Sequence, residues 1–316
     1  MEKYRKFSDA ATSSNPFLPV SMVNPCRESV FVQAVRIGLL SPLLFLRIPL
    51  IVISLVLVGL TDILALIPVL SGIIIRPLLR PVACWLALLV LGISVPLHHS
   101  PEDFRRLGTK RPTGVIKRPS IFLSSFHGFI DVLVHAVVTR PTQFVFPALD
   151  QRFVVCSTVL GAVITALKSP NPTGDVSEVS SHGSVVFLSA SPTNGLGILN
   201  LDKAFLLALT KTQVTQISAI CYKSHGRYGV HHLTESLVSH LLQMMIHNWF
   251  VSVDVRVLPE PIVFTEETVG QIVTFLSRLS GSPETQLDDS TYLEFLAYWH
   301  ETQAANYTQT STKKKM

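Results

Sequence analysis

Two apolar runs near the N-terminus constrain the fold of this chain more than any other feature. They cover residues 48–70 and 81–97, and from residue 37 to residue 97 the only charged side chains are those of Arg47, Asp62, Arg76 and Arg80. A helix needs about 20 apolar residues to cross a bilayer; the first run reaches that length and the second falls slightly short of it. We therefore expect residues 37–97 to form an apolar helical hairpin in a membrane.

The sequence leaves the depth of this hairpin open. Either both helices cross the bilayer or both dip into one leaflet, and a buried pair of core helices is the alternative without a membrane. Basic residues lie on both outer flanks, which favours a cytosolic position for both. We favour the shallow hairpin, because groups that are unfavourable in a spanning helix interrupt the runs or separate them: Pro49, Asp62, Pro68, Arg76 and Arg80.

The rest of the composition narrows the chemistry. The chain of 316 residues is 48% hydrophobic and 15% charged, with a formal net charge of +5. No aromatic residues alternate with the basic residues at 105–118, which argues against nucleic-acid binding. The same basic residues suit anionic lipid headgroups where the chain leaves the bilayer. The four cysteines are far apart, so we expect neither a disulfide framework nor a metal site.

Beyond residue 119, short β-rich runs alternate with amphipathic runs of helical length. This alternation predicts an α/β fold with a mostly parallel sheet covered by helices. The predicted strands are residues 120–126, 143–147, 184–189, 216–223 and 251–258. The predicted helices are residues 130–139, 151–167, 203–211, 232–247, 266–280 and 291–304.

Two polar segments directly follow predicted strands. One carries His127 and Asp131 at the start of a predicted helix, and the other is the loop at residues 189–197. The carboxyl ends of parallel strands meet at one edge of a sheet, where such folds bind ligands, so we expect the two segments to converge. The i,i+4 spacing of His127 and Asp131 places both on one helical face, which makes a contact between them feasible.

The order of these features resembles that of the glycerolipid acyltransferase family. In that family an apolar N-terminal hairpin precedes a strand, a His/Asp motif at a helix start, a second strand and a phosphate-binding loop. Residues 1–19 look closest to a fungal branch that acylates lysophosphatidic acid from oleoyl-CoA at the endoplasmic reticulum and lipid droplets. The resemblance implies an acyltransferase-like α/β domain that uses acyl-CoA as a co-substrate and needs no cofactor.

The first family motif reads Asn-His-x-x-x-x-Asp. Its histidine is the general base, and its aspartate holds the imidazole in the required tautomer. Aligned on Asp131, this chain has Ser125 and Phe126 in place of the family's Asn and His, and His127 follows one residue later. The resemblance implies that His127 and Asp131 are the catalytic pair, in a His-x-x-x-Asp arrangement.

The second family motif, Phe-Pro-Glu-Gly-Thr-x-x-x-Gly, holds the phosphate of the acyl acceptor. It corresponds to residues 187–195, where Ser189, Ala190 and Ser191 stand in place of Glu, Gly and Thr. A later family lysine falls near Lys203, which could supply positive charge. The substrate-binding residues that the resemblance implies are Ser189, Ser191, Asn194, Gly195 and Lys203.

The implied reaction moves an acyl chain from acyl-CoA to a lysophospholipid, with lysophosphatidic acid as the first acceptor and phosphatidic acid as the product. Its partners are membrane lipid, acyl-CoA and the lysophospholipid, while the sequence indicates no particular protein partner. The altered motifs leave a second hypothesis open, a catalytically inactive protein of the same fold that binds lipid or a protein partner. A hairpin that only shapes the membrane is a third.

The sequence also predicts an organisation and a location. We divide the chain into a polar N-terminal segment (1–36), the membrane hairpin (37–97), the α/β domain (98–304) and a basic C-terminal tail (305–316). Lys313 and Lys314 match the dilysine pattern that retains membrane proteins in the endoplasmic reticulum and is read from the cytosol. We expect the endoplasmic reticulum membrane, with lipid droplets as a second location, and a domain that faces the cytosol; a solvated basic tail is the alternative.

Overall fold

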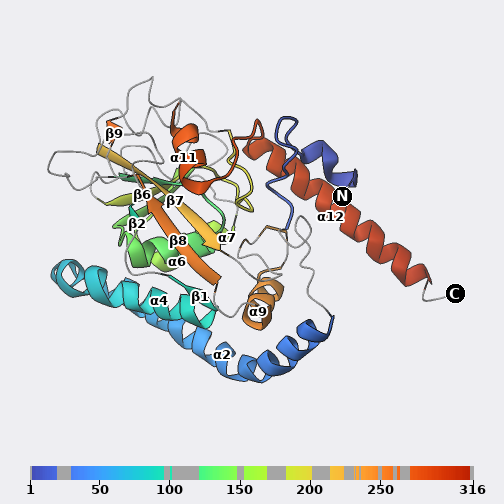
Figure 1. Ribbon diagram of the computed structural model, residues 1–316. Coiled ribbons are helices and arrows are strands. Elements are labelled where there is room, and N and C mark those ends of the chain that lie inside the picture. Colours follow the sequence, from blue (N-terminus) through green and yellow to red (C-terminus); the bar gives the residue numbers. More distant parts are fainter. Residues whose placement is uncertain are drawn as a thin grey trace.

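A computed structural model of the chain shows an α/β fold around a nine-stranded sheet (Figure 1). It describes residues 2–19, 30–95, 100–101, 121–147, 153–168, 183–200, 214–223, 231, 233–234, 236–247, 251–258, 262–263 and 271–313. The strands are β1 (Ile93–Ser94), β2 (Ser100–Pro101), β3 (Ile121–Ser124), β4 (Gln143–Pro147), β5 (Phe153–Cys156), β6 (Ser184–Phe187), β7 (Val214–Lys223), β8 (Val251–Val257) and β9 (Ile262–Val263). The helices are η1 (Glu2–Phe7), α2 (Val30–Leu64), α3 (Pro68–Leu70), η2 (Ser71–Leu79), α4 (Arg80–Val90), α6 (Phe129–Val138), α7 (Val159–Leu167), α9 (Leu237–His247), α11 (Ile272–Ser280) and α12 (Asp289–Lys313).

The α/β class is confirmed, and the sheet is mixed, with five parallel and three antiparallel strand pairings among the described residues. Its order is β1-β8-β7-β3-β6-β4-β5, with β2 also paired to β8 and β9 to β7. β3 pairs in parallel with β6 and β7, β4 with β6, and β1 and β2 with β8. In contrast, β5 is antiparallel to β4, and β8 and β9 are antiparallel to β7. The connection from β4 to β5 is too short for a parallel crossover, so the chain returns as a hairpin.

The predicted helix over residues 151–167 is wrong in its first part. β5 occupies the beginning of that range, and α7 starts only at Val159. The run from Phe153 to Cys156 is rich in aromatic and β-branched residues, which favour an extended chain beside β4. Thr158 caps the helix, because its Oγ1 accepts the N–H of Gly161 at 3.2 Å. The predicted helix at residues 203–211 lies outside the described residues.

Helices cover both faces of the sheet, as Figure 1 shows. The alternation along β4 illustrates how the sequence builds two cores. Phe144 and Phe146 face the core that contains α4, α6 and α7, whereas Val145, between them, faces the second core with α11. Successive strand residues point to opposite faces, so a strand that is apolar throughout becomes buried on both sides.

The apolar hairpin is integrated into this fold. Two helical stretches are long and apolar enough to cross a membrane, Pro42–Leu64 and Pro68–Val90, with mean hydropathies of 2.7 and 1.9. In Figure 1, α2 and α4 lie along one side of the domain, and α4 contacts both α2 and α6. Ala87 and Leu88 of α4 are fully buried in the same core as α6. The hairpin therefore shares its inner face with the α/β core.

The outer face of the hairpin is an exposed apolar surface. Phe45 is 85% exposed, Leu66 74% and Ile73 70%, and most of the large exposed apolar side chains in the described residues belong to this region. A water-soluble surface rarely carries so large a contiguous apolar patch. One face of the hairpin therefore packs against the protein core. The other face is exposed and apolar, so an apolar environment such as lipid can cover it.

Two charges of the hairpin form a buried ion pair. Arg80 Nη2 lies 3.0 Å from Asp62 Oδ1, and the two side chains are only 2% and 6% exposed. Asp62 Oδ2 also accepts the N–H of Leu160, at the start of α7, at 2.8 Å. This pair joins the two hairpin helices to each other and to the α/β domain.

The N-terminal segment packs against the first part of α12 through aromatic rings. Tyr4 stacks on Trp299 with ring centroids 5.3 Å apart, and Phe7 meets Phe295 edge to face at 5.3 Å. Phe17 and Leu199 belong to the same cluster, which places the loop after β6 next to the N-terminal segment and the first part of α12. α12 continues to Lys313, so a helix extends past residue 304, where the sequence predicted its end.

Candidate functional site

The two predicted polar segments meet at one edge of the sheet. β3 and β6 are parallel neighbours, with Ser124 opposite Phe187 at their carboxyl ends. Beyond the strands the segments stay joined: the N–H of Leu188 donates to Ser124 O at 3.0 Å, and that of Thr193 donates to Phe126 O at 3.2 Å. The predicted convergence is therefore confirmed, and it places His127 beside the loop at residues 189–197.

His127 and Asp131 are in contact at the start of α6. The backbone N–H of His127 donates to Asp131 Oδ2 at 2.6 Å, and His127 Nδ1 lies 3.1 Å from the same oxygen. Gly128 precedes the helix with φ +147°, a conformation that favours glycine. Asp131 is fully buried, and His127 is 5% exposed. An ionised carboxylate can only accept hydrogen bonds, so its contact with Nδ1 favours the tautomer that carries the proton on Nδ1.

A pocket lies beside His127, which forms part of its wall. Its wall combines the ends of β3 and β6 with the end of α11: Ser125, Phe126, His127, Leu188, Ser189, Thr193, Gly195, Gly197, Ile198, Leu199, Leu276, Ser280 and Ser282. Gly195 has φ +74°, and a Cβ there would stand 3.6 Å from His127 Nε2. The positive φ favours glycine here, whereas a Cβ at that distance would be in ordinary van der Waals contact with the imidazole.

Two further histidines surround the pair. His135 is one turn beyond Asp131 on α6, fully buried, with Nε2 2.8 Å from Ser124 Oγ. Burial lowers the pKa of His135 to about 4. The ring centroid of His231 lies 5.4 Å from that of His127, and burial lowers the pKa of His231 to about 3. Both imidazoles are therefore neutral at pH 7 and add no positive charge beside Asp131.

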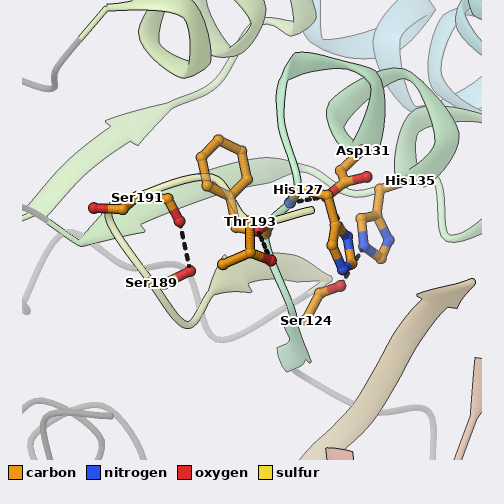
Figure 2. Close-up of polar contacts among 8 residues, drawn as sticks. Ser124, His127, Asp131, His135, Ser189, Ser191 and Thr193 are labelled. Atoms are coloured by element: carbon orange, nitrogen blue, oxygen red, sulfur yellow. Dashed lines mark hydrogen bonds and ion pairs between the residues drawn. The ribbon is translucent and has the colours of Figure 1, made fainter. Parts of the chain in front are cut away.

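Sequence reasoning did not identify His135 as a neighbour of the His127–Asp131 pair. The signal was the spacing of four between Asp131 and His135, which places both on one face of α6; His127 precedes that helix. Figure 2 shows Asp131 and His135 side by side, next to His127 and Ser124.

The side chains of the second motif mostly bond within the protein. Ser189 Oγ donates to Ser191 O at 3.0 Å. Asn194 Nδ2 donates to Asn15 O at 2.9 Å and to Leu18 O at 2.8 Å. The structure thus brings the predicted substrate-binding residues Ser189 and Gly195 to the pocket wall, but it uses the Asn194 amide to hold the N-terminal segment.

Backbone amides of the same loop bind a distant carboxylate. Asp289, the first residue of α12, accepts the N–H of Ala190 through Oδ2 at 3.2 Å and that of Ser191 through Oδ1 at 2.9 Å. Burial raises the pKa of Asp289, while the hydrogen bonds from Ser191 and Ala190 oppose that shift. No local pattern indicated this contact, because almost a hundred residues separate the partners.

One hydroxyl of the pocket wall has no hydrogen-bond partner in the described residues. Ser125 Oγ is buried and has no hydrogen-bond partner in the described part of the chain, and Ser125 lines the pocket next to His127. Lys203, the remaining predicted binding residue, lies outside the described residues. Within the described ranges, no three His, Cys, Asp or Glu side chains are grouped to hold a metal ion.

Comparisons with known proteins do not place the chain in a family. No family model, no curated protein and no solved structure matches it. The functional interpretation therefore depends on the geometry of the residues described above and on the motifs in the sequence.

Proposed function

We propose that this protein is a membrane-bound acyltransferase that moves an acyl chain from acyl-CoA to the free hydroxyl of a lysophospholipid, with lysophosphatidic acid as the first acceptor to test. The observation that carries the proposal is the contact of His127 Nδ1 with the buried carboxylate of Asp131 at 3.1 Å, in a ring that lines a pocket. An imidazole whose Nδ1 proton is held by a carboxylate presents Nε2 as a general base.

In the proposed reaction, Nε2 of His127 takes the proton of the acceptor hydroxyl. The alkoxide oxygen attacks the thioester carbonyl carbon, a C–O bond forms, and the C–S bond breaks with release of the coenzyme A thiolate, which is then protonated. Asp131 stabilises the imidazolium that forms at His127. The hydroxyl of Ser125 is a candidate donor to the oxyanion, because it is buried without a partner in the described residues and lies beside the base.

The hairpin supports a membrane location for this chemistry. Its outer face exposes large apolar side chains such as Phe45 and Leu66, and both substrates carry acyl chains that partition into a bilayer. We propose that this face is immersed in one leaflet, so that the pocket reaches lipids at the membrane surface. We propose the endoplasmic reticulum membrane, with lipid droplets as a second location and the domain in the cytosol, as the family resemblance implies.

The test is product formation by the purified full chain in detergent. Acyl-CoA is supplied with a panel of lysophospholipids, and phospholipid product is quantified by mass spectrometry. We expect His127→Ala to lower kcat by about 10² to 10⁴, the usual effect of losing a general base. His300→Ala is the matched control, because His300 is an exposed histidine on α12. Equal rates for the wild type and His127→Ala would refute the assignment.

A second candidate function is lipid binding without turnover by a protein of the same fold. The specific observation in its favour is that the polar side chains of the loop, including both amide hydrogens of Asn194, bond to the protein itself. This candidate predicts saturable lysophospholipid binding to the wild type with no acyl-CoA consumed on any acceptor. The product assay above distinguishes the two.

A further inference from the structure

The loop at residues 189–195 contains an anion site that is filled from within the chain. Oδ1 and Oδ2 of Asp289 each bind one of two consecutive backbone N–H groups, those of Ser191 at 2.9 Å and Ala190 at 3.2 Å. Successive amides that converge on one anion are a common way in which loops bind phosphate and carboxylate groups. Ser189, in the same loop, lines the pocket beside His127, so this site borders the proposed acceptor site.

Asp289 is not needed to begin α12. The neighbouring residue, Asp288, caps the helix instead. Its Oδ1 accepts the N–H of Thr291 at 3.0 Å and the hydroxyls of Ser290 and Thr291 at 2.7 Å. Asp288 is exposed, whereas Asp289 is half-buried against the loop. Two adjacent acids thus have separate roles, one as the helix cap and the other as the anion of the loop.

We infer that Asp289 determines how this site treats the headgroup of the acceptor: its carboxylate competes with an acceptor phosphate for the amides of Ala190 and Ser191. This inference rests on the proposed function, since it assigns a specificity residue to the same pocket. A phosphate monoester that approaches the loop meets a negative charge where it needs donors, so it must displace the carboxylate or bind elsewhere. An acceptor without phosphate meets no such competition.

Binding measurements on the full chain in detergent test this inference without requiring turnover. Isothermal titration compares lysophosphatidic acid with monoacylglycerol on the wild type, Asp289→Asn and Asp288→Asn. We expect Asp289→Asn to bind lysophosphatidic acid about tenfold more tightly or better, the effect of removing one close like charge. Monoacylglycerol binding is expected to stay unchanged. Asp288→Asn removes the same charge one residue away while preserving a good helix cap, and is expected to change neither.

Every outcome decides the inference. Unchanged or weaker binding of lysophosphatidic acid by Asp289→Asn overturns it, as does an equal gain in Asp288→Asn. If Asp289→Asn does not fold, Asp289→Ser takes its place. If neither variant folds, restoration of folding by millimolar inorganic phosphate, which fills the vacant amides, supports the inference, and failure of phosphate to restore it shows that Asp289 is only a structural brace. Tighter binding without any turnover refutes the acyltransferase proposal but not the role of Asp289.

Discussion

The buried ion pair between Asp62 and Arg80 gives a sharp prediction about how the hairpin is attached. The partners are 3.0 Å apart and only 6% and 2% exposed, so removal of the acid leaves the guanidinium in an apolar interior without its counter-charge. Loss of one partner of a buried pair typically costs about 3–5 kcal/mol. Asp62→Ala also removes the acceptor of the Leu160 N–H, which adds about 1 kcal/mol. We expect the free energy of unfolding to fall by about 4–6 kcal/mol in total.

The assay is denaturant unfolding of the full chain in detergent, followed by circular dichroism. The double variant Asp62→Ala/Arg80→Met is the control that isolates the uncompensated charge. Arg80 Nε and Nη1 have no hydrogen-bond partner in the described residues. Hydrogen bonds therefore offset only part of the free energy that it costs to remove the guanidinium from water. We expect the double variant to regain most of the lost stability. If Asp62→Ala lowered the free energy of unfolding by less than about 1 kcal/mol, the reasoning would be refuted, because that is the contribution of a solvent-exposed ion pair.

Three further predictions concern the site. Burial lowers the pKa of His135 to about 4 in the folded chain, against the ordinary histidine value of 6.5. Between these values the unfolded state binds the extra proton, so the free energy of unfolding should fall by up to about 3 kcal/mol as pH drops from 6.5 to 4. His135→Gln should remove this part of the pH dependence in denaturant titrations. Asn194→Ala removes the two hydrogen bonds to Asn15 and Leu18, and limited proteolysis should then cleave residues 1–19 faster than in the wild type. Ser125→Ala should lower kcat by about 10² or more through the lost oxyanion donor, without lowering the melting temperature, because the hydroxyl has no partner in the described residues; an unchanged kcat would remove Ser125 from the mechanism.

The parts of the structure that depend on local patterns could be predicted from the sequence. The strands that end at Ser124 and Phe187 were visible as short apolar runs, and their parallel pairing brings the two polar segments together. The contact of His127 with Asp131 is feasible from their spacing, but it does not come from one helical face, because α6 begins at Phe129 and His127 precedes it. Neighbouring residues determine each strand and the helix start, whereas the pairing of β3 with β6 joins segments that are distant in the sequence.

The parts that depend on distant contacts could not be predicted. The apolar stretch at 151–167 has helical length and predicts one helix, but pairing with β4 makes its first part, β5, extended. Asp289 lies almost a hundred residues from the amides that it binds, and Asp62 lies as far from Leu160. Periodicity carries no information on which side chain will meet such donors, because tertiary packing decides it.

The central claim is that Asp131 holds the His127 imidazole in the tautomer that acts as a base. The most direct test is the kcat of acyl transfer by Asp131→Asn, measured at saturating acyl-CoA and acceptor beside the wild type. An asparagine of the same shape can donate to the ring and favour the wrong tautomer, so the account predicts that kcat falls by about 10² or more while KM changes little. Full activity of Asp131→Asn would contradict the account.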